Sequence, residues 1–171
     1  MYQGHWRNDK ASGKGRLIHS TGDVYEGDWE NDMAHGKGTY TFTDGSRYEG
    51  DWEKDDKHGF GVEHWQDGSK YDGTYANGKK QGQGTYRWAN GCSYTGDFKE
   101  NHIEGVGKYI WPDGREYEGE WFEDKMHGQG TFTWSDGREY EGQYVNDLKE
   151  GQGTFRWPDG RQYEGNWSKG K

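Results

Sequence analysis

Histidine and cysteine are the residues of this sequence that could bind a metal ion or act as nucleophiles. His35 and His58 occupy equivalent positions one interval of 23 residues apart. If each interval contains two β-strands, these two rings lie about 10 Å apart, whereas each ligand of one zinc ion lies about 2.1 Å from the metal. Cys92 is the single cysteine and has no partner at metal spacing. We therefore expect no metal site within one chain, and zinc held between two chains stays open as an alternative.

Glutamates recur at the same interval and could provide the paired carboxylates of acid–base catalysis. They are Glu26, Glu49, Glu118, Glu141 and Glu164. A group that returns with every interval is unlike an active site, which is usually singular, so the pattern favours solvated or hydrogen-bonding roles. No Ser/His/Asp or Cys/His arrangement accompanies these acids. We predict no catalytic residue, no enzyme activity and no cofactor.

Glycine pairs separated by one residue could suggest a phosphate-binding loop. Gly36-Lys37-Gly38 is followed by Thr39-Tyr40-Thr41, and so lacks both the third glycine and the helix of a dinucleotide-binding loop. A structural role is therefore favoured for the glycines. Those that we assign to structure in the first strand of each unit are Gly27, Gly50, Gly73, Gly96, Gly119 and Gly142.

The elements that position these residues follow from a repeat of 23 residues. Tyr-x-Gly-x-aromatic, then Gly-x-Gly, then a third aromatic and an Asp-Gly pair return in the same order without insertion. The predicted units are 2–24, 25–47, 48–70, 71–93, 94–116, 117–139 and 140–162, with a partial unit at 163–171. A fixed period of this length is typical of solenoids and arrays. We predict one domain, residues 1–171, that consists of this array.

Each unit has the pattern of two strands. In the unit 25–47, tyrosine, glycine and tryptophan alternate with acids over residues 25–30, which predicts a strand with one apolar face. Residues 31–35 are polar and predict a turn, and a second alternating strand follows over residues 36–43. No helical periodicity appears. The sequence predicts an all-β, elongated, single-layer antiparallel hairpin solenoid of about 14–15 strands, twisted into a trough.

The connection between units can be predicted in more detail. Phe42 and Tyr48 must face the same side of the sheet, so the loop between them has an odd number of residues. Thr43-Asp44-Gly45 fits a three-residue hairpin loop, which combines a type I turn with a glycine in the left-handed region. Pro112 and Pro158 directly precede Asp-Gly pairs, where the fixed φ of proline suits such a turn.

Composition excludes several classes of protein. Of 171 residues only 27% are hydrophobic, but 17% are aromatic, which provides large surfaces for burial. The net charge of −9 argues against nucleic-acid binding. No apolar run is long enough to cross a membrane, and no signal peptide is visible. The single cysteine fits a reducing compartment, and we expect a cytoplasmic protein.

The aromatic face is the candidate binding surface. A single sheet has no second layer to cover this face, so some of its rings should stay exposed and mark an interaction site. We expect a protein segment, either a strand or an amphipathic helix, to bind there. The predicted groove residues are Trp29, Phe42, Trp52, Trp65, Tyr75, Trp88, Phe98, Trp111, Trp121, Trp134, Tyr144 and Trp157.

The terminal units lead to a second expectation. They carry no polar caps, which solenoids usually need, and exposed edge strands invite pairing. We expect either a fragment of a longer array or self-association, with a homodimer formed through a terminal repeat.

The unit Tyr-Glu-Gly-x-Trp, His-Gly-x-Gly, aromatic-x-aromatic and Asp-Gly resembles the MORN (membrane occupation and recognition nexus) repeat. Residues 25–47, 117–139 and 140–162 carry the resemblance most fully. Glu63 departs from it by replacing the aromatic of Tyr40. The resemblance implies a β-hairpin ribbon that serves as a scaffold or adaptor in cytoskeletal, ciliary, cell-cortex or membrane-junction settings.

Two alternatives follow from the same family resemblance. The first is a peripheral membrane module that binds anionic phospholipids or phosphoinositides through basic residues near the Asp-Gly turns. The net charge of −9 disfavours it. The second is an accessory module of a larger enzyme, since the family also occurs fused to lipid kinases and methyltransferases.

Overall fold

The computed structural model describes residues 1–171 and contains fifteen β-strands and no helix. It therefore has no helix that could cross a membrane. The chain forms two compact units, Met1–Ala89 and Asn90–Lys171. The strands of the first unit are β1 (Tyr2–Arg7), β2 (Lys10–Ile18), β3 (Val24–Glu30), β4 (Met33–Thr41), β5 (Arg47–Glu53), β6 (Asp56–His64), β7 (Lys70–Ala76) and β8 (Lys79–Arg87). Those of the second unit are β9 (Ser93–Lys99), β10 (His102–Ile110), β11 (Glu116–Phe122), β12 (Lys125–Thr133), β13 (Glu139–Val145), β14 (Leu148–Arg156) and β15 (Gln162–Trp167).

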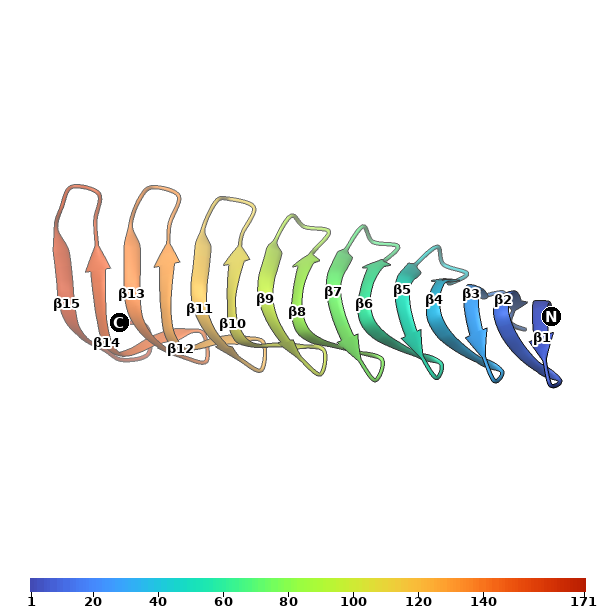
Figure 1. The fold of residues 1–171 in the computed structure, drawn as a ribbon. Helices are drawn as coiled ribbons and strands as arrows, with labels where there is room; N and C mark the ends of the chain where they lie inside the picture. The colour runs from blue at the N-terminus through green and yellow to red at the C-terminus, as the bar shows by residue number, and fades with distance from the viewer. The chain divides into compact units, whose positions relative to one another are not determined.

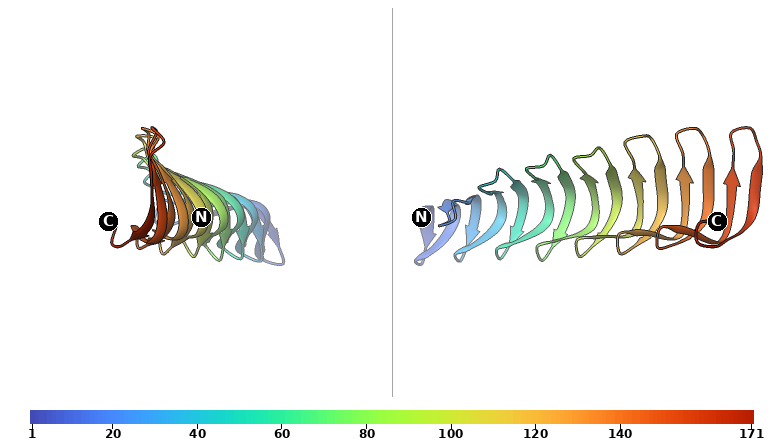
Figure 2. Two further views of the ribbon diagram at one scale, coloured as in Figure 1. Left: turned by 90° about the vertical axis from the view of Figure 1, so that its left-hand side faces the viewer. Right: turned by 180° about the vertical axis from the view of Figure 1, so that it is seen from behind.

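Within each unit the chain is an antiparallel meander. Every strand pairs with its neighbour in the sequence, and the strands lie side by side in chain order (Figure 1). Views from two further directions show one layer of curved strands in each unit (Figure 2). The predicted all-β hairpin solenoid is therefore confirmed.

The predicted three-residue loop between repeats is also confirmed. The Gly45 N–H donates to the Phe42 carbonyl at 3.0 Å, and the Phe42 N–H donates to the Ser46 carbonyl at 2.8 Å. Gly45 has φ +93°, the left-handed conformation that closes a type I turn with a bulge. Asp44 Oδ1 accepts the Ser46 N–H at 2.8 Å, which explains why an aspartate precedes the glycine.

The other turn of each repeat is tighter than predicted. The prediction of a turn over residues 31–35 is wrong, because Glu30 pairs with Met33 and only Asn31 and Asp32 form the loop. These two residues have φ 50° and 68°, as a type I′ turn requires, and Asn and Asp tolerate that conformation.

A β-bulge accounts for the polar residues that were assigned to the turn. Gly27 pairs with Gly38 and Trp29 pairs with Ala34, so Asp28 alone faces the three residues 35–37. Asp28 Oδ2 accepts the Lys37 N–H at 2.9 Å and satisfies this unpaired backbone donor. The bulge increases the local twist of the strand pair, which suits a curved single-layer sheet.

The core of each repeat lies on one face of the sheet. The most deeply buried side chains are the first tyrosines of five consecutive units, each less than 2% exposed: Tyr48, Tyr71, Tyr94, Tyr117 and Tyr140. The opposite face carries charged and polar residues, together with a few isolated apolar side chains such as Phe60 and Val106. Burial is therefore one-sided, as the alternating sequence predicts.

Candidate partner-binding groove

The floor of the aromatic face is formed by the first strand of each repeat. Tyr25 is 2% exposed, and its hydroxyl donates to the Asp28 carbonyl at 2.7 Å. The neighbouring Trp29 is 8% exposed, and its Nε1–H donates to the Gly15 carbonyl at 3.0 Å. The two rings meet edge to face with centroids 5.1 Å apart. With their polar atoms satisfied, these residues form a fixed base for the groove.

Glycine pairs allow the tyrosines to lie flat against the backbone. The glycine at 27 faces the one at 38 across the hairpin, and a Cβ atom on Gly38 would collide with the ring and hydroxyl of Tyr25. The six glycines predicted to be structural lie in such pairs: Gly27, Gly50, Gly73, Gly96, Gly119 and Gly142.

The second strand and the Asp-Gly turn add a second row of rings, in which turn rings such as Trp111 are half-buried and the strand ring Phe132 is buried. In the second unit Trp111 stacks obliquely on Tyr109 at 4.6 Å and on Phe132 at 5.2 Å. The ladder continues through Trp134, which lies 4.5 Å from Phe132. The rings of this row contact each other, and no second sheet or helix covers them.

An arginine covers one side of three tryptophans in this row. The guanidinium of Arg115 lies 5.2 Å from the centroid of the Trp111 ring, and the same pair recurs at Arg138 and Trp134. Arg161 lies 5.3 Å from the Trp157 ring. These are cation–π distances, so the arginines that follow the Asp-Gly turns form a rim along the aromatic row.

Each rim arginine is also paired with the aspartate of its own turn. The Nε–Oδ2 distance is 2.8 Å from Arg115 to Asp113, and 2.8 Å from Arg138 to Asp136. The carboxylates reduce the positive charge that this rim presents, which disfavours a role as a binding site for anionic lipid headgroups.

The twelve predicted groove residues separate into two classes of exposure. The strand aromatics are buried and form the floor: Trp29, Trp52, Tyr75, Phe98, Trp121 and Tyr144. The turn aromatics are half-buried and form the accessible surface: Phe42, Trp65, Trp88, Trp111, Trp134 and Trp157. A partner on this face would therefore contact the second set directly.

Sequence reasoning missed three lysines on the aromatic face. The Nζ of Lys149 lies between 5.3 and 5.8 Å from the centroids of four rings: Trp134, Tyr140, Phe155 and Trp167. Lys80 lies over three rings and Lys57 over two. Burial lowers the pKa of Lys149 and of Lys80. The available signal was their shared position, five residues after the aromatic of the first strand.

The departure at Glu63 is explained by one of these lysines. Glu63 is 7% exposed and occupies the place of an aromatic ring. Its Oε1 lies 2.9 Å from Lys57 Nζ and accepts the Tyr75 hydroxyl at 2.7 Å. The carboxylate is thus paired and hydrogen-bonded, as a buried charge requires.

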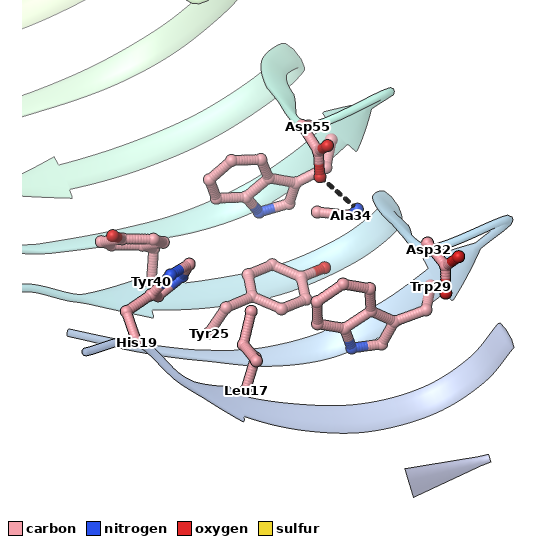
Figure 3. Close-up of a pocket in the computed structure, with 9 residues that line it drawn as sticks. Leu17, His19, Tyr25, Trp29, Asp32, Ala34, Tyr40 and Asp55 are labelled. Carbon is pink, nitrogen blue, oxygen red and sulfur yellow. Dashed lines mark hydrogen bonds between the residues drawn. The ribbon is translucent and has the colours of Figure 1, made fainter. Parts of the chain in front are cut away.

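A cavity of about 280 Å³ lies on the aromatic face of the first unit. The side chains of Tyr25, Trp29 and Tyr40 line it together with those of Asp32 and Asp55, above the small side chain of Ala34 (Figure 3). Leu17, His19 and Trp52 complete the lining. Asp55 Oδ1 accepts the Ala34 N–H at 2.7 Å, which fixes this carboxylate at the rim.

The histidines and acids considered for chemistry lie in other surroundings. His35 Nε2 lies 3.3 Å from Glu30 and His58 Nε2 lies 3.1 Å from Glu53, so each equivalent histidine pairs with an acid of its own hairpin. No group of three or more potential metal ligands is present. The repeated glutamates Glu26, Glu49, Glu118, Glu141 and Glu164 are exposed.

Comparison with solved structures finds the same kind of fold in a domain from Drosophila melanogaster. The chain is similar to the TCP domain of SAS-4 (dCPAP) from Drosophila melanogaster, which was solved in complex with a proline-rich motif of Ana2 (dSTIL). The TM-score is 0.55 at 10% identity, over 91% of this chain and 85% of that one. The TCP10 domain of Danio rerio CPAP, in complex with a peptide of STIL, matches at TM-score 0.29 and 14% identity, over 96% and 83% of the two chains.

The sequence comparisons are more specific. No curated protein matches the chain. The model of the MORN repeat matches residues 2–24, 25–47, 48–70, 71–93, 94–114, 117–137, 140–160 and 163–171. These segments start at the same residues as the units predicted from the 23-residue period. The chain therefore belongs to the MORN repeat family.

Proposed function

We propose that this protein is a non-catalytic scaffold that binds a protein segment along its aromatic face. The observation that carries the proposal is the row of half-buried turn aromatics on the uncovered side of a single sheet. Exposed aromatic strips mark interaction sites, and aromatic anchors dominate the energy of protein interfaces. A bound segment would supply the missing second layer.

The complex of the Drosophila domain supports a peptide as the partner. That domain was solved with a proline-rich motif. Extended proline-rich segments bind to aromatic-lined grooves, because their conformation costs little entropy to fix. An extended segment of this kind, a strand or an amphipathic helix would each fit a row of rings such as Tyr109, Trp111 and Phe132.

The family and this likeness support a cytoskeletal or cell-cortex setting for the scaffold, in the cytoplasm. The lipid-binding alternative rests on the basic residues near the Asp-Gly turns, and three of these, the rim arginines, already pair with turn aspartates. It predicts salt-sensitive sedimentation with anionic liposomes. If no sedimentation occurs at low salt, lipid binding is removed as an explanation.

A pull-down from cell extract with three rings removed tests the groove. We expect the variant Trp88→Ala, Trp111→Ala, Trp134→Ala to lose the partner that the unchanged chain retains, with its β circular dichroism preserved. The matched control replaces Phe60 and Val106, which are 53% and 57% exposed on the opposite face. Equal capture by the triple variant and the unchanged chain would disprove groove binding.

Self-association through a terminal repeat is a second part of the proposal. Trp6 of β1 is 61% exposed and Tyr163 of β15 is 47% exposed, which leaves apolar surface on both edge strands. Exposed edges favour pairing with a second chain. Light scattering at high concentration should show a mass above 19.8 kDa. A constant monomer mass would refute it.

A further inference from the structure

The cavity above Ala34 occupies a position that three other repeats fill with a lysine. Ala34 faces Trp29 across its hairpin, as Lys57 faces Trp52, and Lys149 faces Tyr144. Adding one, two or five intervals of 23 residues to position 34 gives the three lysines at 57, 80 and 149. Alanine leaves open the space that these long side chains occupy.

The rings around the cavity match those around Lys149 one for one. The set His19, Tyr25, Tyr40 and Trp52 corresponds, five intervals later, to Trp134, Tyr140, Phe155 and Trp167. All four members of the second set surround the Lys149 ammonium. Three rings of the first set are about as large as their counterparts in the second set. The exception is His19, which has a smaller ring than its counterpart Trp134.

The geometry of the two sets is also the same. Tyr25 and Trp52 have centroids 5.3 Å apart at 88°, and their counterparts Tyr140 and Trp167 have centroids 5.3 Å apart at 85°. The centroids of Tyr40 and Trp52 are 6.2 Å apart at 37°. For the counterparts Phe155 and Trp167 the values are 6.2 Å and 33°. The cage around Ala34 is therefore preformed for a group like the one at Lys149.

Charge at the cavity favours a cation. Asp32 and Asp55 both line it, whereas the corresponding surroundings of Lys149 contain Asp147 and, in place of the second acid, Gly170. A ring cage attracts cations through its π faces, most strongly when the cation is desolvated. Two nearby carboxylates add to that attraction. The volume of about 280 Å³ is at the small end of ligand pockets and suits one side chain.

We propose that the cavity formed by Tyr25, Tyr40, Trp52, Asp32 and Asp55 binds the side-chain ammonium of a lysine from a protein partner. The partner's lysine takes the place that Lys149 takes in its own repeat. This inference rests on the proposed function, because the lysine would enter from a segment lying on the aromatic face, and it specifies a basic residue in that segment.

The experiment uses n-butylammonium chloride as a probe of the lysine side chain. The ¹H–¹⁵N spectrum of the full chain reports the indole N–H groups of its ten tryptophans. We expect saturable shifts of Trp29 and Trp52, at least tenfold weaker binding of 1-butanol, and loss of the butylammonium shifts in Ala34→Lys. Equal binding of the alcohol, or undiminished binding in a folded Ala34→Lys protein, would overturn the proposal.

If the Ala34→Lys protein does not fold, a second variant tests the proposal by gaining a butylammonium site in the second unit. Lys149→Ala should create a new butylammonium site, reported by the indoles of Trp134 and Trp167. Lys149→Met is the matched control, because Met126 fills the equivalent position of its own repeat, and it should create no site. No new site in a folded Lys149→Ala protein would contradict the inference.

Failure of this inference and failure of the proposed function give different results. If the tryptophan variants lose the partner but neither alanine cage binds butylammonium, the groove stands and the lysine site is wrong. If the cages bind butylammonium but the pull-down is unaffected by the tryptophan variants, the cavities bind ammonium groups, but the groove model is wrong and with it the assignment of a partner's lysine.

Discussion

The contact between a tyrosine ring and a pair of glycines is the feature that fixes each repeat. Tyr48 is fully buried, and its hydroxyl donates to the Asp51 carbonyl at 2.7 Å. A Cβ atom on Gly50 would lie 2.5 Å from both the Gly61 Cα and the Phe60 carbonyl oxygen. The backbone approaches itself too closely here for any side chain, so these glycines are required by packing.

Gly50→Ala should therefore lower the free energy of unfolding by about 3 kcal/mol or more, since overpacking against backbone cannot be relieved by a rotamer change. Urea unfolding followed by circular dichroism measures this loss. Gly68→Ala is the control, because its Cβ would meet nothing within 4 Å and only its φ of +95° is unfavourable. We expect that control to cost about 1–2 kcal/mol. Equal losses would contradict the packing argument.

The buried tyrosines also predict a dependence on alkaline pH. Burial raises the pKa of Tyr25, Tyr48, Tyr71, Tyr94 and Tyr117 well above the ordinary value. The unfolded chain ionises its tyrosines near pH 10, at about their ordinary pKa. Their contribution to stability is therefore complete below about pH 10 and is lost as the pH rises above it.

Unfolding midpoints in urea should be constant with respect to these groups up to about pH 10 and fall at higher pH. Ultraviolet absorbance should show the buried phenolates appearing together with the loss of β structure. Ionisation of every tyrosine near pH 10 in a chain that keeps its circular dichroism would show that the rings are accessible.

At the scale of the hairpin, aspartates of the type I′ turns connect one repeat to the preceding one. Asp147 Oδ1 accepts the Met126 N–H at 2.8 Å, and the Asp147 N–H donates to the Met126 carbonyl at 3.0 Å. Asp124 binds the backbone of Ile103 in the same two ways. Since these bonds cross between repeats, they stabilise the stacking of hairpins, which is the coupling that solenoids depend on.

Asp147→Gly should lower the free energy of unfolding by about 1–2 kcal/mol, because it removes a charged acceptor from a backbone N–H. Glycine accepts the φ of 71° at this position, so the substitution adds no backbone strain. Asp147→Asn keeps an acceptor oxygen and should stay within about 0.5 kcal/mol of the unchanged chain. Equal stability of the glycine and asparagine variants would show that the side-chain acceptor at position 147 does not stabilise the stacking of the hairpins. Thermal or urea unfolding distinguishes the cases.

The two turns of a repeat show what the sequence can and cannot predict at this scale. The Thr43-Asp44-Gly45 loop was predictable for two reasons. Phe42 and Tyr48 must face the same side of the sheet, which requires an odd number of loop residues, and Asp-Gly is typical of a three-residue hairpin loop. The tight Asn31-Asp32 turn was not, because the bulge beside Gly36 moves three residues into the strand, and their polarity is also typical of a loop. The alternation of apolar and polar residues along a strand does not show where a bulge interrupts that alternation.

At the scale of the whole molecule, each compact unit is one sheet thick, and this explains why the exposure of its aromatic face was predictable only in part. Alternation identifies every ring on that face. It does not distinguish the buried strand rings such as Trp121 from the half-buried turn rings such as Trp134, because both are large and aromatic. The lysine cages were also hidden, since Lys149 has the sequence character of a surface residue and only three dimensions bring four rings around it.

The central claim is that a partner binds on the aromatic face, and photo-crosslinking in cells tests it most directly. A benzoylphenylalanine side chain is placed at position 111, which is Trp111, or at position 106, which is Val106, exposed on the opposite face. We predict a covalent partner adduct from position 111 and none from position 106. An adduct from position 106 alone would place the partner on the polar face and contradict this account.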